Sequence, residues 1–149
     1  MATAELQTVI ALPPPGIFEA LCDLGRRPSI DPTITEISPP SGGLQAGSTF
    51  SGRGTMANSG SGFDGIVTAL EQDSFLGLGY TLANGATMQE QWDLMPVPSG
   101  TLVTYRAELR LPGGLLGKLL DRLMVSSGFQ KQREGVLQSI KTAFERRAT

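Results

Sequence analysis

The chain of 149 residues contains no histidine and only one cysteine, Cys22. An intramolecular disulfide therefore cannot form, and a metal site built from cysteine and histidine is excluded. The same absences exclude a serine–histidine–aspartate triad and a cysteine–histidine pair as catalytic machinery. We expect no metal and no cofactor. Cys22 is interpreted as a small apolar core residue, because no base in the sequence would activate its thiol.

Charge of either sign is also scarce, since charged residues make up 17% of the chain and the net charge is −2. No basic run is long enough to indicate binding to nucleic acid or to an anionic membrane. No uncharged apolar stretch approaches the roughly 20 residues that span a bilayer, so we expect no stable membrane insertion. The opening string MATAELQTVIAL lacks a basic region and a long apolar region, which predicts no secretory signal and a cytoplasmic protein.

Glycine is abundant instead, with 19 copies, as is typical of a protein rich in strands, turns and bends. The length suits one domain over residues 1–149. Residues 6–12 predict a first strand, which three prolines end before a short helix begins. Gly25 ends that helix, and residues 26–30 predict a second short one. The apolar residues of the first helix recur at helical spacing: Ile17, Phe18, Leu21 and Cys22.

Between residues 34 and 111, short segments of alternating apolar residues are separated by turn signals. This pattern predicts about six antiparallel strands joined as a meander. Asn84-Gly85 predicts the clearest hairpin, with a type I′ turn in which both residues have positive φ. Alternation also assigns the face of each strand that points inward. The inner face is predicted to carry Leu76, Leu78, Tyr80, Leu82, Met88, Glu90, Trp92, Leu94, Val103, Tyr105, Ala107, Leu109 and Leu111.

After residue 114 the apolar periodicity becomes helical, which predicts one long C-terminal helix with a bend near residues 126–128. Such a helix must pack across the sheet to bury its apolar face. Its first half is denser in leucine than one core face requires, which indicates a pocket lid, a portal or a homodimer contact. This leucine-rich block comprises Leu115, Leu116, Leu119, Leu120, Leu123 and Met124, and a second stripe comprises Phe129, Val136, Leu137, Ile140 and Phe144.

The order of one strand, two short helices, six strands and a long helix resembles that of the START-like, or Bet v 1-like, superfamily of helix-grip proteins. Several strings also resemble its bacterial polyketide cyclase/dehydrase and lipid-transport branch, in order along essentially the whole chain. The resemblance implies an α+β fold, a curved seven-stranded antiparallel sheet wrapped around the C-terminal helix. The strings are LPP (12–14), IFEALCDL (17–24), RP (27–28), DPTI (31–34), WDL (92–94), GTLVTY (100–105) and the helix 129–144.

The resemblance further implies a cavity between sheet and helix that holds a lipid, a polyketide or a similar apolar molecule. Some relatives carry or sense such a ligand, whereas others catalyse its cyclisation or dehydration, so the fold does not settle the activity. This chain departs from the family at Ile30, where a tryptophan often precedes the Asp-Pro pair. The predicted ligand-binding residues are Ile30, Leu78, Tyr80, Met88, Trp92, Tyr105, Leu116, Leu120, Leu123 and Met124.

Three polar residues are candidates for chemistry in that cavity. Glu90, between apolar neighbours, would be partly desolvated, as suits general acid/base work. The alternatives are a position at a strand end or an ion pair with an internal partner such as Arg53. Ser51 and Arg53 share one strand face and are similar to a polar pair of some aromatase/cyclase members, where arginine would hold a carbonyl or an enolate. However, Phe50 and Met56 compete for the inner face, and their alternation would leave Arg53 in solvent.

Three functions are compatible with these patterns. The first is binding or transfer of a hydrophobic small molecule, which needs only an apolar cavity and a portal. The second is a cofactor-independent polyketide cyclase or dehydratase that uses Glu90 with Arg53, Ser51 or a tyrosine. The third is an accessory protein that docks a partner through its leucine-rich helix.

Overall fold

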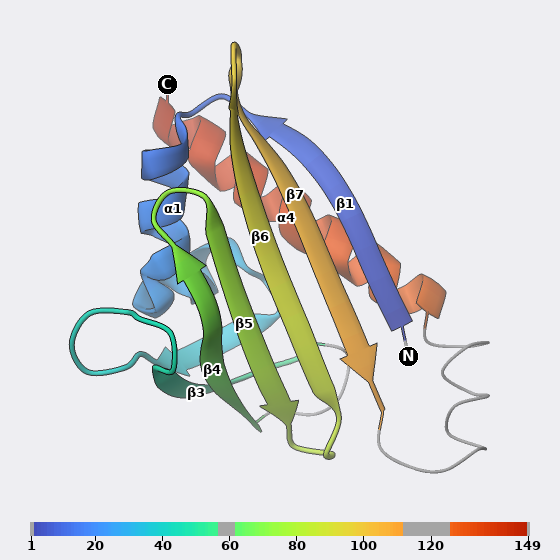
Figure 1. Ribbon diagram of the computed structural model, residues 1–149. Helices are drawn as coiled ribbons and strands as arrows, with labels where there is room; N and C mark the ends of the chain where they lie inside the picture. Colours follow the sequence, from blue (N-terminus) through green and yellow to red (C-terminus); the bar gives the residue numbers. More distant parts are fainter. Residues whose placement is uncertain (1, 57–61, 112–125, 149) are drawn as a thin grey trace.

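The computed structural model describes residues 2–56, 62–111 and 126–148. Within these residues, seven strands form one antiparallel sheet in the order β1-β7-β6-β5-β4-β3-β2 (Figure 1). The meander from β2 to β7 is therefore sequential, and β1 joins it beside β7. In chain order the elements are β1 (Ala2–Ile10), α1 (Pro14–Cys22), the short 3-10 helix η1 (Leu24–Arg26), α2 (Arg27–Ile30), β2 (Ile34–Ser38), β3 (Thr49–Gly54), β4 (Gly62–Glu71), β5 (Phe75–Leu82), β6 (Thr87–Val97), β7 (Gly100–Arg110) and α4 (Ser126–Ala148).

The helices lie on one side of the sheet. In Figure 1, α4 runs diagonally behind β6 and β7, and it packs against β1 and α2. α1 lies against β5 and β6. The apolar stripe predicted for the C-terminal helix is buried, because its spacing places all its members on the side of α4 that faces the core. The predicted helix-grip fold is confirmed; the stripe consists of Phe129, Val136, Leu137, Ile140 and Phe144.

The curvature of the sheet is associated with shifts of register in β2 and β4. In β4 the shift lies between Val67 and Ala69, so that Thr68 is an extra residue relative to β5. An extra residue in one strand bends it and increases its local twist. The Thr68 hydroxyl stands where a side chain at Gly77 of β5 would lie. Glycine at this position therefore lets the bulge close against the neighbouring strand.

The predicted hairpin between β5 and β6 is present, but its predicted turn type is wrong. Gly85 has a φ of 88°, whereas Asn84 is not among the residues with positive φ. The Gly85 amide donates to the Leu82 carbonyl at 2.9 Å. The Asn84 side-chain oxygen accepts from the Ala86 amide at 2.9 Å. The turn thus needs positive φ at the glycine alone, because the asparagine side chain supplies part of its hydrogen bonding.

The first strand lies nearer the N-terminus than the alternation over residues 6–12 predicts. Ala2 and Ala4 pair with Leu109 and Ala107 of β7, and both alanines are buried. Alanine is only weakly hydrophobic, so two alanines at alternate positions give a weak signal for the buried face of a strand. The strand nevertheless ends before the prolines, as predicted.

The leucine-rich block of the C-terminal segment lies outside the described residues, so its prediction concerning a lid, a portal or a dimer contact stays a prediction. The described part of the helix begins at Ser126, within the predicted bend. None of the described helices is both long enough and apolar enough to cross a bilayer. The predicted ligand-binding residues outside the described ranges are Leu116, Leu120, Leu123 and Met124.

Candidate functional site

Glu90 is a carboxylate on the buried face of β6. It lies between Met88 and Trp92, and only 1% of its surface is exposed. Strand alternation points its side chain inward, and it pairs with Leu78 of β5 on one side and Ala107 of β7 on the other. A carboxylate buried this deeply is tolerated only where hydrogen-bond donors and cations compensate its charge. Those compensating groups define the candidate site.

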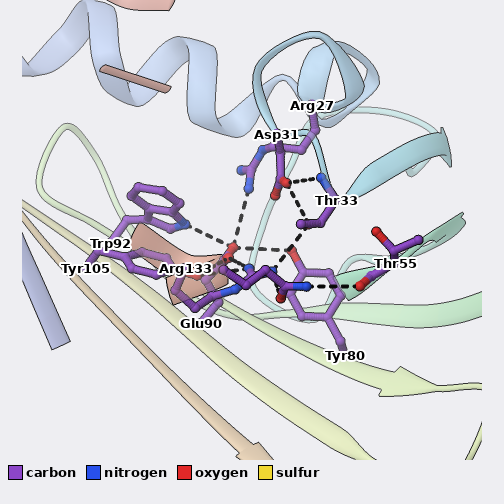
Figure 2. A network of polar contacts seen from close by, with 10 residues as sticks. Arg27, Asp31, Thr33, Thr55, Tyr80, Glu90, Trp92, Tyr105 and Arg133 are labelled. Atoms are coloured by element: carbon purple, nitrogen blue, oxygen red, sulfur yellow. Dashed lines mark hydrogen bonds and ion pairs between the residues drawn. The ribbon is translucent and has the colours of Figure 1, made fainter. Parts of the chain in front are cut away.

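Three aromatic side chains from the inner face of the sheet donate hydrogen bonds to Glu90 (Figure 2). The indole N–H of Trp92 donates to Oε1 at 3.0 Å, and the hydroxyl of Tyr80 donates to the same oxygen at 3.3 Å. The hydroxyl of Tyr105 donates to Oε2 at 2.7 Å. The structure therefore brings together four of the residues that the sequence predicted for the site, with their polar ends turned toward one carboxylate.

Two buried arginines converge on the same carboxylate from different helices. Nη1 of Arg27, in α2, lies 3.4 Å from Oε1 of Glu90. Nη1 of Arg133, in α4, lies 3.6 Å from Oε2. Both arginine side chains are at most 1% exposed. Figure 2 shows both guanidinium groups reaching Glu90, so this residue connects the sheet to α2 and α4.

Further hydrogen bonds hold the two arginines in place. Nη2 of Arg27 donates to the Leu21 carbonyl at 2.6 Å. Nη2 of Arg133 donates to the Thr33 hydroxyl at 3.3 Å, and that hydroxyl donates to Oδ1 of Asp31 at 2.6 Å. Asp31 also accepts from the Thr33 amide at 2.8 Å, the local turn expected of an aspartate there. The buried network therefore extends from β6 to the loop between α2 and β2.

The same environment keeps both tyrosines protonated. Burial, the largest cause, and then the negative charge of Glu90 raise the pKa of Tyr80 and the pKa of Tyr105 well above the ordinary value of 10.0. The phenols are therefore hydrogen-bond donors at neutral pH and do not act as bases. The aromatic rings themselves are packed closely: the Trp92 and Tyr105 ring centroids lie 4.3 Å apart.

We expect no tyrosine of the folded protein to ionise near pH 10. The chain has two tyrosines, Tyr80 and Tyr105, so tyrosinate absorbance reports on this site alone. Because their pKa values are higher in the folded than in the unfolded state, their stabilisation is complete below the unfolded pKa of about 10 and is lost as pH rises through the folded pKa. An alkaline titration that follows tyrosinate absorbance and far-ultraviolet circular dichroism should show both signals changing together. A tyrosinate transition near pH 10 in protein that is still folded would contradict this expectation.

Of the two placements that the sequence left open for Arg53, the structure has the outward one, so the candidate role of Ser51 and Arg53 inside the cavity is wrong. Both residues lie on the exposed face of β3. The Arg53 side chain is 68% exposed and its Nε lies 3.8 Å from a carboxylate oxygen of Glu36. Phe50 takes the inner face instead, and its ring packs edge-on against Tyr80 at a centroid distance of 5.8 Å. Because adjacent residues of a strand point to opposite faces, the aromatic ring inside forces the serine and the arginine outside.

The two cations that hold Glu90 were not predicted from the sequence. Arg133 lies four residues after Phe129 and three before Val136, so it occupies an inward position of the apolar stripe. That spacing was a usable signal. Arg27 belongs to a helix of four residues, which is too short to show a periodic pattern. Only the tertiary fold places it beside the carboxylate.

The remaining predicted ligand-binding residues that the structure describes, Ile30, Leu78 and Met88, are buried in the same core. Two surface hollows lined by described residues do not include any of the predicted site residues. One lies on the outer face of the sheet, lined by Gln89, Gln91, Arg106 and Glu108. Another lies beside Ser29 along α4. Both have polar walls, unlike the predicted apolar cavity, which part of the leucine-rich block would border.

Fold and site together define a helix-grip protein with a buried charge network on the inner face of its sheet. The long helix α4 contributes Arg133 to this network. A family model described as polyketide cyclase / dehydrase and lipid transport matches residues 1–145, and the chain belongs to this family. The resemblance inferred from the sequence is thereby confirmed. No curated protein matches the chain in sequence.

Solved structures of the same fold include an aromatase/cyclase and a Bet v 1-like protein. The Zhui aromatase/cyclase from Streptomyces sp. R1128 has a TM-score of 0.71 and 14% identity over 99% of this chain and 95% of that chain. Ara h 8.0201 has a TM-score of 0.68 and 15% identity over 95% and 96%. TTHA0849 from Thermus thermophilus has a TM-score of 0.74 and 14% identity over 99% of each chain. At these identities the likeness concerns the fold.

Proposed function

We propose that the chain binds an apolar small molecule on the inner side of the sheet, against the aromatic residues that surround Glu90. The observation that supports this most directly is the character of the inner face of β5, β6 and β7. Apart from Thr101, the tyrosine hydroxyls and the indole N–H of Trp92, its buried side chains are apolar, with Glu90 as the one charge. Small-molecule sites combine such apolar walls with a few convergent polar groups. Membership of a family described by lipid transport and by polyketide cyclisation agrees with this proposal.

The hydrogen bonds that Glu90 already accepts favour a binding function over catalysis by this carboxylate. Oε1 accepts hydrogen bonds from Trp92, Tyr80 and Arg27, and Oε2 accepts one from Tyr105. A general base needs a lone pair within reach of the substrate proton. Here the lone pairs are directed at protein donors. Glu90 therefore fits the role of an internal anion that orients the polar ends of the aromatic side chains.

Energy transfer from Trp92 to a bound dye tests the proposal. This is the single tryptophan of the chain, and its side chain is buried on the inner face. The neutral dye N-phenyl-1-naphthylamine should bind, accept excitation from Trp92, and be displaced by apolar molecules extracted from cells. Native mass spectrometry of the protein after incubation with such an extract should show the retained molecule.

A matched control separates the inner site from the outer surface. Met95 is 57% exposed on the same strand, so Met95→Ser should leave dye binding and energy transfer unchanged. Dye binding that Met95→Ser abolishes would place the dye on the outer face and overturn the proposal. A dye that binds without energy transfer from Trp92 would overturn it as well.

A cyclase or dehydratase is the second candidate, and one observation favours it. The Tyr105 hydroxyl donates to Glu90 at 2.7 Å and accepts from Nη1 of Arg133 at 3.3 Å, so a cation and an anion hold a protonated phenol between them. Under this alternative the phenol turns its single O–H from Glu90 to a developing oxyanion, while Arg133 continues to donate to the phenol oxygen. Under this alternative, Tyr105→Phe retains dye binding but loses conversion of the extracted molecule, which the mass of the bound species reports.

A further inference from the structure

Each arginine of the network retains one N–H group without an acceptor. Nε of Arg27 and Nε of Arg133 are buried, and neither has a hydrogen-bond partner within the part of the chain that the structure describes. Burying a donor without an acceptor costs free energy, and the cost is greater when the group is charged. Two such donors in one cluster are therefore available to a further acceptor, beyond those that the described residues supply.

The direct contacts of the two arginines favour a carboxylate as the acceptor. Both arginines contact Glu90 through Nη1 only, whereas an arginine with a carboxylate of its own commonly forms two parallel hydrogen bonds. Asp31, the other buried acid nearby, accepts from Thr33, and in the described residues it forms no ion pair with either arginine. Two guanidinium groups thus share one carboxylate in direct contact. A ligand carboxylate would be a second acid in direct contact with them, in addition to Asp31, whose negative charge acts on both arginines without an ion-pair contact.

Both arginines also border the aromatic surface proposed to hold the ligand. Cζ of Arg27 lies 5.9 Å from the centroid of the Trp92 ring, and Nη1 of Arg133 donates to the Tyr105 hydroxyl at 3.3 Å. In Figure 2 the two side chains approach the rings of Trp92 and Tyr105 from the helical side of the sheet. A molecule whose apolar body lies against these rings would bring its end to the guanidinium groups.

We propose that Arg27 and Arg133 bind the carboxylate of an amphipathic ligand, which makes apolar carboxylic acids the ligand class. This inference rests on the proposed binding function and specifies the polar head group of the ligand. A carboxylate has two oxygens and about four lone-pair sites, enough to accept from both Nε groups at once. Arginine suits this role because its charge persists when it is buried, and because its planar fork matches carboxylate geometry.

The first test compares two probes that differ only at the head group. Decanoate and 1-decanol are titrated against protein loaded with N-phenyl-1-naphthylamine, and the dissociation constants are obtained from displacement. We expect decanoate to bind about ten- to a hundredfold more tightly, the range for charge-assisted hydrogen bonds. The preference should fall severalfold in Arg133→Lys, which keeps the charge but lacks Nε. Arg53→Lys, on the exposed face, should retain it.

The second test observes the two donors in the unaltered protein, so it does not depend on a variant that folds. In ¹H–¹⁵N spectra, the Nε–H signals of two arginines should move downfield on addition of decanoate and stay in place with decanol. Equal affinity for both probes, with unmoved Nε–H signals, would overturn the inference and leave the binding function intact. Failure of the dye and of both probes to bind would overturn the proposed function as well.

Discussion

Replacing Glu90 by glutamine is expected to lower the free energy of unfolding by about 3–5 kcal/mol. The substitution preserves size but leaves Arg27 and Arg133, both buried, without a counter-ion in direct contact. A buried guanidinium that loses its carboxylate retains the whole cost of its desolvation, which explains the size of the effect. Urea denaturation followed by circular dichroism measures the change.

The matched control is Glu36→Gln. Glu36 also pairs with an arginine, Arg53, but the two side chains are 75% and 68% exposed, and their contact is 3.8 Å long. Exposed ion pairs of this kind contribute between about 0 and 1 kcal/mol, so we expect a small change. Equal losses of stability in the two variants would show that Glu90 does not compensate the buried arginines.

Replacing Trp92 by alanine is expected to lower the free energy of unfolding by a comparable amount, about 3–5 kcal/mol. The Trp92 side chain is completely buried, packs on Tyr105, and donates its N–H to Glu90. Alanine removes the apolar contacts, opens a cavity and takes one donor from the carboxylate. Since the variant lacks the only tryptophan, unfolding is followed by circular dichroism rather than by fluorescence.

Two further variants divide this effect into its parts. Trp92→Phe keeps an aromatic ring but loses the N–H donor, so we expect a smaller loss, about 1.5–3 kcal/mol for a hydrogen bond to a charged group. Met95→Ala, on the exposed face of the same strand, should change stability by no more than about 0.5 kcal/mol. A Trp92→Ala variant as stable as Met95→Ala would contradict the packing described for this residue.

These stability effects determine how a catalytic role should be tested. Loss of turnover in Glu90→Gln would not identify Glu90 as an acid or base, because the same substitution is expected to weaken the fold. Tyr105→Phe removes one hydroxyl and retains the ring that packs on Trp92. It is therefore the more informative variant for the cyclase or dehydratase alternative.

Much of the fold was predictable because its signals are local. Alternation over β5, β6 and β7 assigned the inner faces, and every inner residue assigned there from Leu76 to Leu109 is buried. Helical spacing identified the buried stripe of α4 in the same way. The errors and the choices left open lie where local signals are weak or compete. Alanines obscured the start of β1, and on β3 the choice between Phe50 and Arg53 for the interior rested on an ambiguous pattern.

The site was predictable only in part. Glu90 was recognised as exceptional because a carboxylate interrupted an apolar face, and the aromatic residues around it followed from alternation. Its counter-ions did not follow, because Arg27 lies 63 residues away in sequence and Arg133 belongs to the last helix. The ion pair considered with Arg53 named a residue on the wrong face of its strand.

The amino-acid sequence by itself determined the succession of strands and helices, the buried face of β5, β6, β7 and α4, and the presence of one acid among the inner apolar residues. Periodicity encodes these features because each depends on residues close together in the chain. Only the tertiary structure decided which charges meet that acid. Burial makes an unpaired carboxylate untenable, but which distant cations satisfy it depends on how α2 and α4 pack on the sheet, and no local pattern specifies that packing.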